Sequence, residues 1–199
     1  MGATMMHRKP HSTGQSGFTL IEVMIAIVVL MIGILTVVAA LATAVATTHN
    51  AQENLIARQK ALEAMESIFT ARNTQQVTFP QIGNIASGGI FTSGPTPLWS
   101  AGPDGLVNTA DDVPFPASGV CPAGPECITL PGPDGILGTA DDVAMSLANF
   151  TRNIVITPVL EADGSINPNL KQITVTVSYT NAFPVPRSYS VNALISSYR

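Results

Sequence analysis

Residues Ser16–Leu35 read SGFTLIEVMIAIVVLMIGIL, an apolar run that contains one charged side chain, the carboxylate of Glu22. From Phe18 to Thr48 no other charged residue occurs. About 20 apolar residues are enough to cross a bilayer as a helix, so the sequence predicts a transmembrane segment over residues 18–48. The preceding residues 1–17 are polar and basic, which favours a cytoplasmic N-terminus with the rest of the chain across the membrane.

Three interpretations of this N-terminus differ in where the chain is cleaved. The first is a secretory signal cut after the small residues Ala42-Thr43-Ala44, and the second is an uncleaved signal anchor. In the third, cleavage after Gly17 leaves the whole helix in place. A carboxylate inside a membrane helix costs a few kcal/mol and usually has a partner and a task. Glu22 could equally be a hydrated residue at the membrane interface.

The sequence after the apolar run favours the third interpretation. Leu55, Leu62 and Phe69 recur every seven residues, which predicts that one helical face is buried on the chain's own domain. The apolar residues near this line are Ala51, Ala61, Met65 and Ile68. Neither Gly nor Pro occurs between Ile34 and Phe79, so one helix is expected over residues 18–72. A discarded signal has no reason to continue into an amphipathic helix.

The stretch Gly17-Phe18-Thr19-Leu20-Ile21-Glu22 resembles the processing site of type IV prepilins, and the helix after it is most similar to minor pilins of the pilus-modification (PilV-like) group. The resemblance implies that residues 1–17 are a leader, that prepilin peptidase cuts between Gly17 and Phe18, and that the new amine is methylated. It also implies that Glu22 pairs with the Phe18 amine of a neighbouring pilin. The expected location is the inner membrane with a periplasmic head, and later the pilus. Type II secretion pseudopilins are near relatives of this group.

The rest of the chain is predicted to form a head in two parts. Residues 73–151 are rich in Gly, Pro, Ser and Thr and indicate loops with short strands at Val77–Phe79 and Gly89–Thr92. Residues 152–199 contain three β candidates, Asn153–Leu160, Lys171–Tyr179 and Arg187–Ser197. An antiparallel meander of these strands against the long helix gives the predicted fold class, α+β and pilin-like.

A repeat within the loop-rich part suggests a metal site. GPDGLVNTADDV at 102–113 recurs as GPDGILGTADDV at 132–143. Carboxylates among glycine turns suit Ca²⁺, although the spacing is not that of an EF-hand loop, and two solvated acidic turns are the alternative. The candidate ligands are Asp104, Asp111, Asp112, Asp134, Asp141 and Asp142.

Other features of the sequence limit the possible functions. Cys121 and Cys127 would lie outside the cytoplasm and could form a disulfide across a short loop that contains Pro and Gly. The formal net charge of −4 argues against binding nucleic acid. No nucleophile, metal-protease or phosphate-loop motif occurs, so an enzyme is not expected, and Ca²⁺ is the one candidate cofactor. A membrane-anchored envelope protein that binds calcium or a ligand without polymerising is the alternative from a different class.

Overall fold

The computed structural model describes residues 17–180 and 186–198, which form two compact units that meet between Thr47 and Thr48. The elements follow in the order α1 (Leu20–Asn73), a 3-10 turn (Ile85–Ser87), and six strands. These are β1 (Thr96–Pro97), β2 (Cys127–Leu130), β3 (Val143–Ser146), β4 (Phe150–Leu160), β5 (Ile166–Thr180) and β6 (Pro186–Ser196). The predicted leader, except for Gly17, and the predicted turn at 181–185 lie outside the described residues.

Helix α1 has a capped start and a sharp end. The carbonyl of Thr19 accepts from the backbone N–H groups of Glu22 and Val23 at 3.1 and 3.2 Å, so Thr19 is the N-cap. After Asn73, Gln75 adopts a left-handed φ of 66°, and the N–H of Gln76 bonds back to the carbonyl of Ala71. The helix therefore ends in a tight reversal before the first proline of the head.

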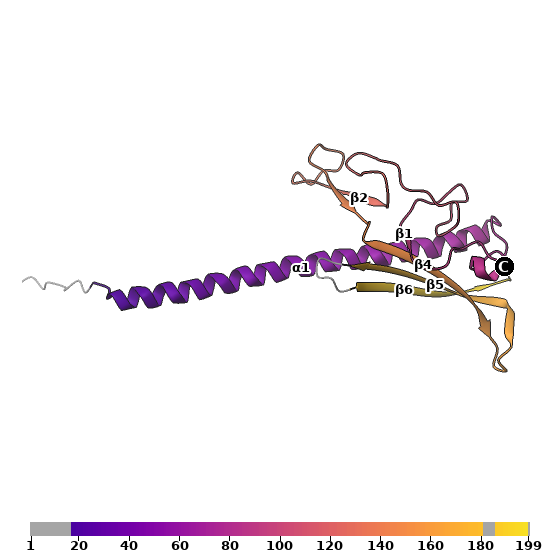
Figure 1. The fold of residues 1–199 in the computed structure, drawn as a ribbon, viewed down its shortest axis with the longest axis horizontal. Coiled ribbons are helices and arrows are strands. Elements are labelled where there is room, and N and C mark those ends of the chain that lie inside the picture. The colour runs from indigo at the N-terminus through magenta and orange to yellow at the C-terminus, as the bar shows by residue number, and fades with distance from the viewer. Residues whose placement is uncertain (1–16, 181–185, 199) are drawn as a thin grey trace, which may run out of the picture. The chain divides into compact units, whose positions relative to one another are not determined.

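The head contains a four-stranded antiparallel sheet in the order β1-β4-β5-β6 (Figure 1). Strands β4, β5 and β6 form the predicted meander, with Ile154 opposite Val175 and Val175 opposite Val191. β-Branched residues dominate these strands because they fit a pleated surface that is buried on one side. The α+β arrangement of a long helix and a C-terminal antiparallel sheet is confirmed.

The core lies between the sheet and the part of α1 that belongs to the head. Side chains alternate along β5, so that Ile173, Val175 and Val177 are fully buried while the residues between them are half-buried. Four of the nine buried residues of the helix are alanines, which lets its backbone approach the sheet closely. Its buried residues are Ile56, Ala57, Lys60, Ala61, Ala64, Met65, Ile68, Ala71 and Arg72.

The predicted stripe on this part of α1 is partly wrong: Ala61, Met65 and Ile68 are buried as expected, but the leucines are not. Leu55 and Leu62 are 64% and 43% exposed, and Phe69 is only partly buried. The heptad spacing identified a real apolar line, but the sheet packs on the opposite side of the helix, where the alanines lie. Lys60 is buried as well.

The outer edge of β4 is covered mainly by side-chain amides. The Asn84 side chain donates to the carbonyl of Ile154 and accepts from the N–H of Ile156, both at 2.8 Å, much as a neighbouring strand would. The side chain of Asn108 donates to the carbonyl of Arg152 at 3.1 Å. Two asparagines from the loop-rich region therefore complete the hydrogen bonding of this edge beside the two-residue β1.

The short strands predicted in the loop-rich region are absent from the described residues. Val77–Phe79 forms turns, because the chain is still reversing after α1, and Gly89–Thr92 contributes a single bridge between Asn84 and Phe91. The strands that do occur there are β1, which joins the main sheet, and β2 and β3, which form a separate two-stranded sheet.

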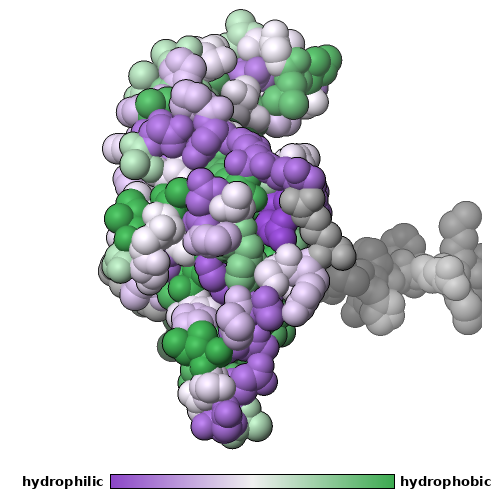
Figure 2. All heavy atoms as spheres, turned by 90° about the vertical axis from the view of Figure 1, so that its right-hand side faces the viewer, coloured by the Kyte–Doolittle hydropathy of each residue, from purple (hydrophilic) through white to green (hydrophobic). Residues whose placement is uncertain are grey.

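The hairpin of β4 and β5 extends beyond the sheet as an arm, which projects at the bottom of Figure 2. Its two strands stay paired through Leu160 and Ile166, and both side chains are more than 60% exposed. The turn at its tip is closed by Asp163, which accepts from the N–H and hydroxyl of Ser165 at 2.9 and 2.6 Å. These bonds hold the pKa of Asp163 below its usual value.

Candidate functional site

The predicted processing and assembly residues lie at the start of α1. Phe18 is 81% exposed, and a side chain at Gly17 would meet no atom within 4 Å. Phe18 and Glu22 line one shallow apolar hollow on the helix surface, together with Val23, Ala26, Ile27 and Leu30. The structure thus places the predicted cleavage point and the only carboxylate of the apolar segment about one helical turn apart.

Thr19 and Glu22 form a feature that the sequence analysis missed. The N–H of Glu22 lies 3.4 Å from the hydroxyl of Thr19, so that Thr19 and Glu22 occupy the N-cap and N3 positions and make one of the two bonds of a capping box. The signal was visible in the sequence as Thr-x-x-Glu directly before an apolar run. An acidic residue in the first turn also interacts favourably with the positive end of the helix dipole. Glu22 therefore stabilises the start of the helix, besides any role in assembly.

The apolar part of α1 has the properties of a membrane span. Every side chain from Gly17 to Val45 is exposed in the isolated chain, and α1 is long and apolar enough to cross a bilayer. The hydroxyls of Thr36, Thr43 and Thr47 each donate to a backbone carbonyl three residues earlier at 2.8 Å. Because these polar groups are satisfied within the helix, they add little to the cost of placing it in lipid.

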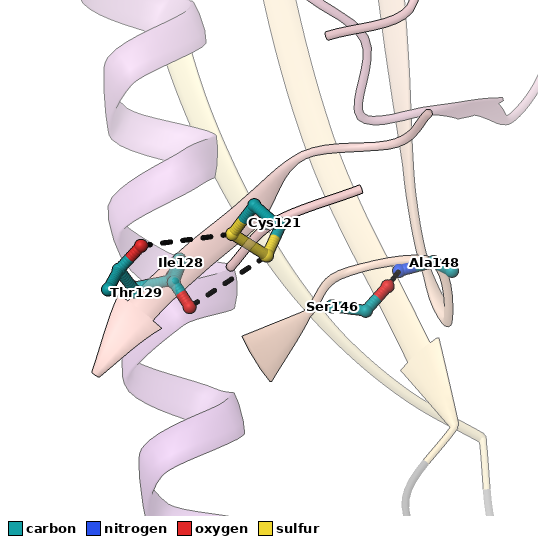
Figure 3. Close-up of a disulfide and its surroundings, with 6 residues drawn as sticks. Cys121, Ile128, Thr129, Ser146 and Ala148 are labelled. Carbon is teal, nitrogen blue, oxygen red and sulfur yellow. Dashed lines mark hydrogen bonds between the residues drawn. A yellow bond between two sulfur atoms is a disulfide. The ribbon is translucent and has the colours of Figure 1, made fainter. Parts of the chain in front are cut away.

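Cys121 and Cys127 are joined in a disulfide with their Cα atoms 5.7 Å apart (Figure 3). Cys121 follows a turn that is held by two backbone hydrogen bonds with Ser118, and Cys127 is the first residue of β2. The bridge therefore connects the segment that follows the first acidic repeat to the two-stranded sheet of β2 and β3.

The two acidic repeats fold in the same way. In each, the first aspartate accepts from an N–H two residues later at 2.8 Å, at Leu106 and at Ile136. The next carboxylate, Asp111 or Asp141, accepts from the threonine hydroxyl two residues before it at 2.7 or 2.6 Å. These hydroxyl bonds, from Thr109 and from Thr139, are the main cause that holds the pKa of Asp111 and Asp141 below the usual value.

The first glycine of each repeat is required by a close approach. A Cβ at Gly102 would lie 2.4 Å from the backbone oxygen of Asp111, and one at Gly132 would lie 2.2 Å from that of Asp141. The position after the apolar pair has a positive φ in both copies, 62° at Asn108 and 88° at Gly138. The shared sequence therefore encodes a specific twelve-residue loop rather than a flexible acidic segment.

The carboxylates of these loops are used mainly to hold the loops together. Asp112 and Asp142 accept from the N–H groups of Asn108 and Gly138 at 2.7 and 2.8 Å. Within residues 17–180 and 186–198, no group of three or more His, Cys, Asp or Glu side chains is placed to hold a metal ion. The structure therefore does not bring the three aspartates of either copy to one point, and calcium binding stays a prediction.

The surroundings of the two copies differ. In the first copy Leu106 and Asn108 are only 1% exposed, and burial raises the pKa of Asp112. In the second copy Ile136 and Leu137 are 60% and 61% exposed. The first loop is part of the head's core, and the second stands in solvent.

The comparison with known families bears on the N-terminal part alone. The profile of the prokaryotic N-terminal methylation motif matches residues 12–46. The chain thus carries the N-methylation motif of pilin and prepilin-type proteins, which supports a type IV pilin or pseudopilin-like protein. No curated protein and no solved structure matches the chain.

Proposed function

We propose that this protein is a minor subunit of a type IV pilus and is incorporated into the filament or primes its assembly. The observation that carries the proposal is the methylation motif over residues 12–46, which coincides with an exposed apolar helix that has one carboxylate in its first turn. A small head whose main sheet packs on a helix suits a subunit that acts by assembling. The proposed role involves no catalysis.

Processing is proposed to remove the leader between Gly17 and Phe18, with methylation of the Phe18 amine by the same peptidase. The open surroundings of Gly17 and Phe18 in the isolated chain support this, because an extended backbone without a side chain can enter a narrow active site. Retention of α1 after processing follows from its continuation into the core of the head.

The proposed role of Glu22 is to pair with the charged Phe18 amine of a neighbouring pilin. When helices leave the bilayer and pack together, an isolated carboxylate would lose its water without compensation. A cation on the neighbour removes that cost, so the pair favours the assembled state. Glu22 lies in the same hollow as its own Phe18, about one helical turn away, which supports a role for both residues at the same end of the helix.

The proposed location is the inner membrane as a single-pass protein with a periplasmic head, followed by the pilus or cell surface. The basic leader favours a cytoplasmic N-terminus. The disulfide between Cys121 and Cys127 fits an oxidising compartment on the other side.

A type II secretion pseudopilin is the second candidate, since the same methylation motif supports pseudopilin-like proteins. The two candidates share processing and differ in the machine they serve. A deletion strain separates them: loss of surface pili indicates the pilus, whereas loss of secreted proteins with normal pili indicates the secretion system.

Mass spectrometry of the mature protein tests the class. The expected chain begins at a methylated Phe18, and the protein is recovered with sheared pili. A chain that begins after Ala44, or an intact leader in cells that assemble pili, contradicts the proposal. The membrane-anchored, non-polymerising alternative predicts an unmethylated N-terminus and no protein in the sheared fraction.

A further inference from the structure

Strand β6 forms one edge of the main sheet, and among the described residues no strand lies on its outer side (Figure 1). It pairs with β5 from Pro186 to Ser196 without a register shift. The opposite edge of the sheet is covered by β1, Asn84 and Asn108. We propose that the open edge of β6 is a binding site for an extended, uncharged peptide segment of another protein, which adds to the sheet as a further antiparallel strand.

The backbone groups at the open edge follow from the pairing of β5 and β6. The N–H of Ser197 donates to the carbonyl of Asn169 at 2.9 Å, so the backbone of Ser197 points toward β5. In an antiparallel pair the backbone groups of successive residues point alternately toward the partner strand and away from it. The N–H and C=O groups that point away from β5 therefore belong to Ser188, Ser190, Asn192, Leu194 and Ser196.

This row of unpaired backbone groups identifies the partner as a strand. An extended peptide presents N–H and C=O groups at the same two-residue spacing, so it satisfies the whole row at once. Proteins usually protect an open edge with charged residues, prolines, bulges or a very short strand. Strand β6 has 11 residues, and its only proline and its only charge are Pro186 and Arg187 at its start. From Ser188 to Ser196 no such feature prevents another strand from pairing.

The side chains of β6 define what the partner must carry. Tyr189, Val191 and Ala193 face the core opposite buried residues of β5, but they are only half-buried because no further strand covers them. On the other face the exposed side chains carry no charge; they are Ser188, Ser190, Asn192 and Leu194. A strand in which apolar residues alternate with uncharged polar residues therefore matches both faces.

Arg187 favours one direction of the partner strand. Its side chain is exposed at the start of β6 and has no ion pair among the described residues. A strand that runs antiparallel to β6 ends beside Arg187, so a carboxylate at its C-terminal end is attracted to the guanidinium group. The attraction is modest because both groups are exposed to water. The partner is therefore expected to be antiparallel, with an acidic group at or just after its end.

A second copy of this chain is not the favoured occupant of the edge. Two β6 strands that pair antiparallel are related by a two-fold axis, so their α1 helices run in opposite directions. Copies held in one membrane by this helix, as proposed above, cannot pair in this way. In a parallel two-fold pair, like residues would face each other with side chains on opposite faces of the sheet, which the pleat does not allow. The antiparallel step rests on the proposed location, so self-association is measured separately.

A synthetic peptide with the sequence of residues 172–180, QITVTVSYT, is the probe. It has the required alternation and no charged side chain, and it is made with an acetylated N-terminus and a free C-terminal carboxylate. Binding of the fluorescently labelled peptide to the full chain in detergent micelles is measured by anisotropy and should saturate.

Two N-methylated forms of the peptide test the strand pairing. If the valines of the bound peptide continue the half-buried row of β6, the backbone N–H groups of its threonines point toward β6. N-methylation at Thr174 and Thr176 of the peptide should then lower the affinity at least about tenfold. N-methylation at Val175 and Val177 is the matched control and should have little effect, because those N–H groups point to solvent.

Substitutions in β6 test the same contact from the side of the protein. Asn192→Pro removes an N–H from the open edge and should weaken peptide binding at least about tenfold, whereas Asn192→Ala keeps this N–H and should bind normally. Val191→Pro is the folding control: it removes an N–H that points to β5, so it should lower the melting temperature much more than Asn192→Pro. Arg187→Glu should lower the affinity roughly two- to fivefold.

Several outcomes would overturn the proposal. These are equal binding of the two N-methylated peptides, unchanged binding to Asn192→Pro, and no binding at any soluble concentration of the unmodified peptide. Self-association of the full chain without peptide, if Asn192→Pro abolishes it, would identify a second copy as the occupant and overturn the proposal as well. If Asn192→Pro fails to fold, the two N-methylated peptides decide. The assay requires neither leader cleavage nor filament assembly, so its failure is distinct from failure of the proposed pilus function.

Discussion

Lys60 on α1 lies with its Nζ 2.5 Å from Oε1 of Glu126, the residue before β2, and 2.8 Å from Oε2 of Glu63. Burial alone would lower the pKa of Lys60, but the hydrogen bonds and charges of Glu126 and Glu63 outweigh it and raise the pKa. This contact fastens the disulfide-containing loops to the helix. The N–H of Glu126 also donates to Leu98 and its carbonyl accepts from Leu147, each at 2.8 Å, so its position is fixed by its own backbone.

Lys60→Ala is expected to destabilise the head by about 3 kcal/mol, the low end for breaking a buried pair, because Glu126 loses its partner. Lys60→Met combined with Glu126→Gln should recover most of this loss. Urea unfolding of a fragment that begins at Thr48 measures both. Because the pKa of Lys60 is raised, its contribution is complete below the ordinary value of 10.5 and is lost as the pH rises through the higher folded value. An unchanged midpoint for Lys60→Ala would show that the contact is not stabilising.

Sequence patterns predicted the elements that depend on local chemistry. The long helix follows from an uninterrupted run of helix-compatible residues, and strands β4, β5 and β6 follow from β-branched alternation. The direction of the helix face could not be predicted, because Leu55 and Leu62 form a more conspicuous stripe than Ala57, Ala61 and Ala64. Only the sheet, formed by residues about 100 positions later, selects the small side chains for close packing.

The contacts at the sheet edge and the hydrogen bonds within the acidic loops could not be predicted from the sequence, for a related reason. Asn84 and Asn108 act through side-chain amides on residues 70 and 44 positions away, at Ile154 and Arg152. Nothing in the local pattern distinguishes these asparagines from turn residues. The repeat revealed that residues 102–113 and 132–143 are alike, but not that hydrogen bonds within each loop would engage the aspartates.

Asn84→Ala should destabilise the head by about 2–4 kcal/mol, because it leaves the buried carbonyl of Ile154 and the N–H of Ile156 without partners. Asn84→Asp keeps an acceptor for Ile156 but cannot donate to Ile154, so its loss should be similar or larger. Asn149→Ala, which removes the 2.8 Å bond from an exposed side chain to the carbonyl of Thr180, is the matched control and should have a small effect. Equal stability of Asn84→Ala and Asn149→Ala would argue against the strand-like role of Asn84.

Removing the disulfide with Cys121→Ser and Cys127→Ser should cost about 2 kcal/mol, since the closed loop is short. Alkylation of the native protein without reductant should label neither thiol, and labelling after reduction should reach both. The contact between Lys60 and Glu126 should keep the loops docked in the variant. If removal of the bridge abolishes folding, the loops depend on the disulfide far more than the contacts indicate.

Glu22→Ala should leave membrane insertion intact or improve it, because a charge leaves the apolar segment. Recovery in sheared pili should fall, since the Phe18 amine of the neighbour loses its proposed partner. Glu22→Gln keeps the shape and should fail similarly, whereas Glu22→Asp should retain part of the function. Thr19→Ala is the control for the capping role, because it weakens the helix start by about 1 kcal/mol without removing the charge. Wild-type recovery of Glu22→Gln would refute the charge pairing.

Calcium binding, if the acidic loops have it, is expected in the second copy. Its aspartates lie in an exposed loop, whereas Leu106 and Asn108 anchor the first loop in the core. An ion would have to replace the hydroxyl bond from Thr139 to Asp141 and gather carbonyls and water, so the predicted affinity is millimolar, the weak end for extracellular modules. The low pKa of Asp141 keeps its carboxylate charged at neutral pH and available to a cation. Calorimetry and melting curves of the fragment that begins at Thr48 should show weak Ca²⁺ binding. Asp141→Asn should abolish this binding, and Asp111→Asn should leave it unchanged. No heat and no melting shift at millimolar Ca²⁺ would identify both loops as turns that use their aspartates only to hold their own backbone.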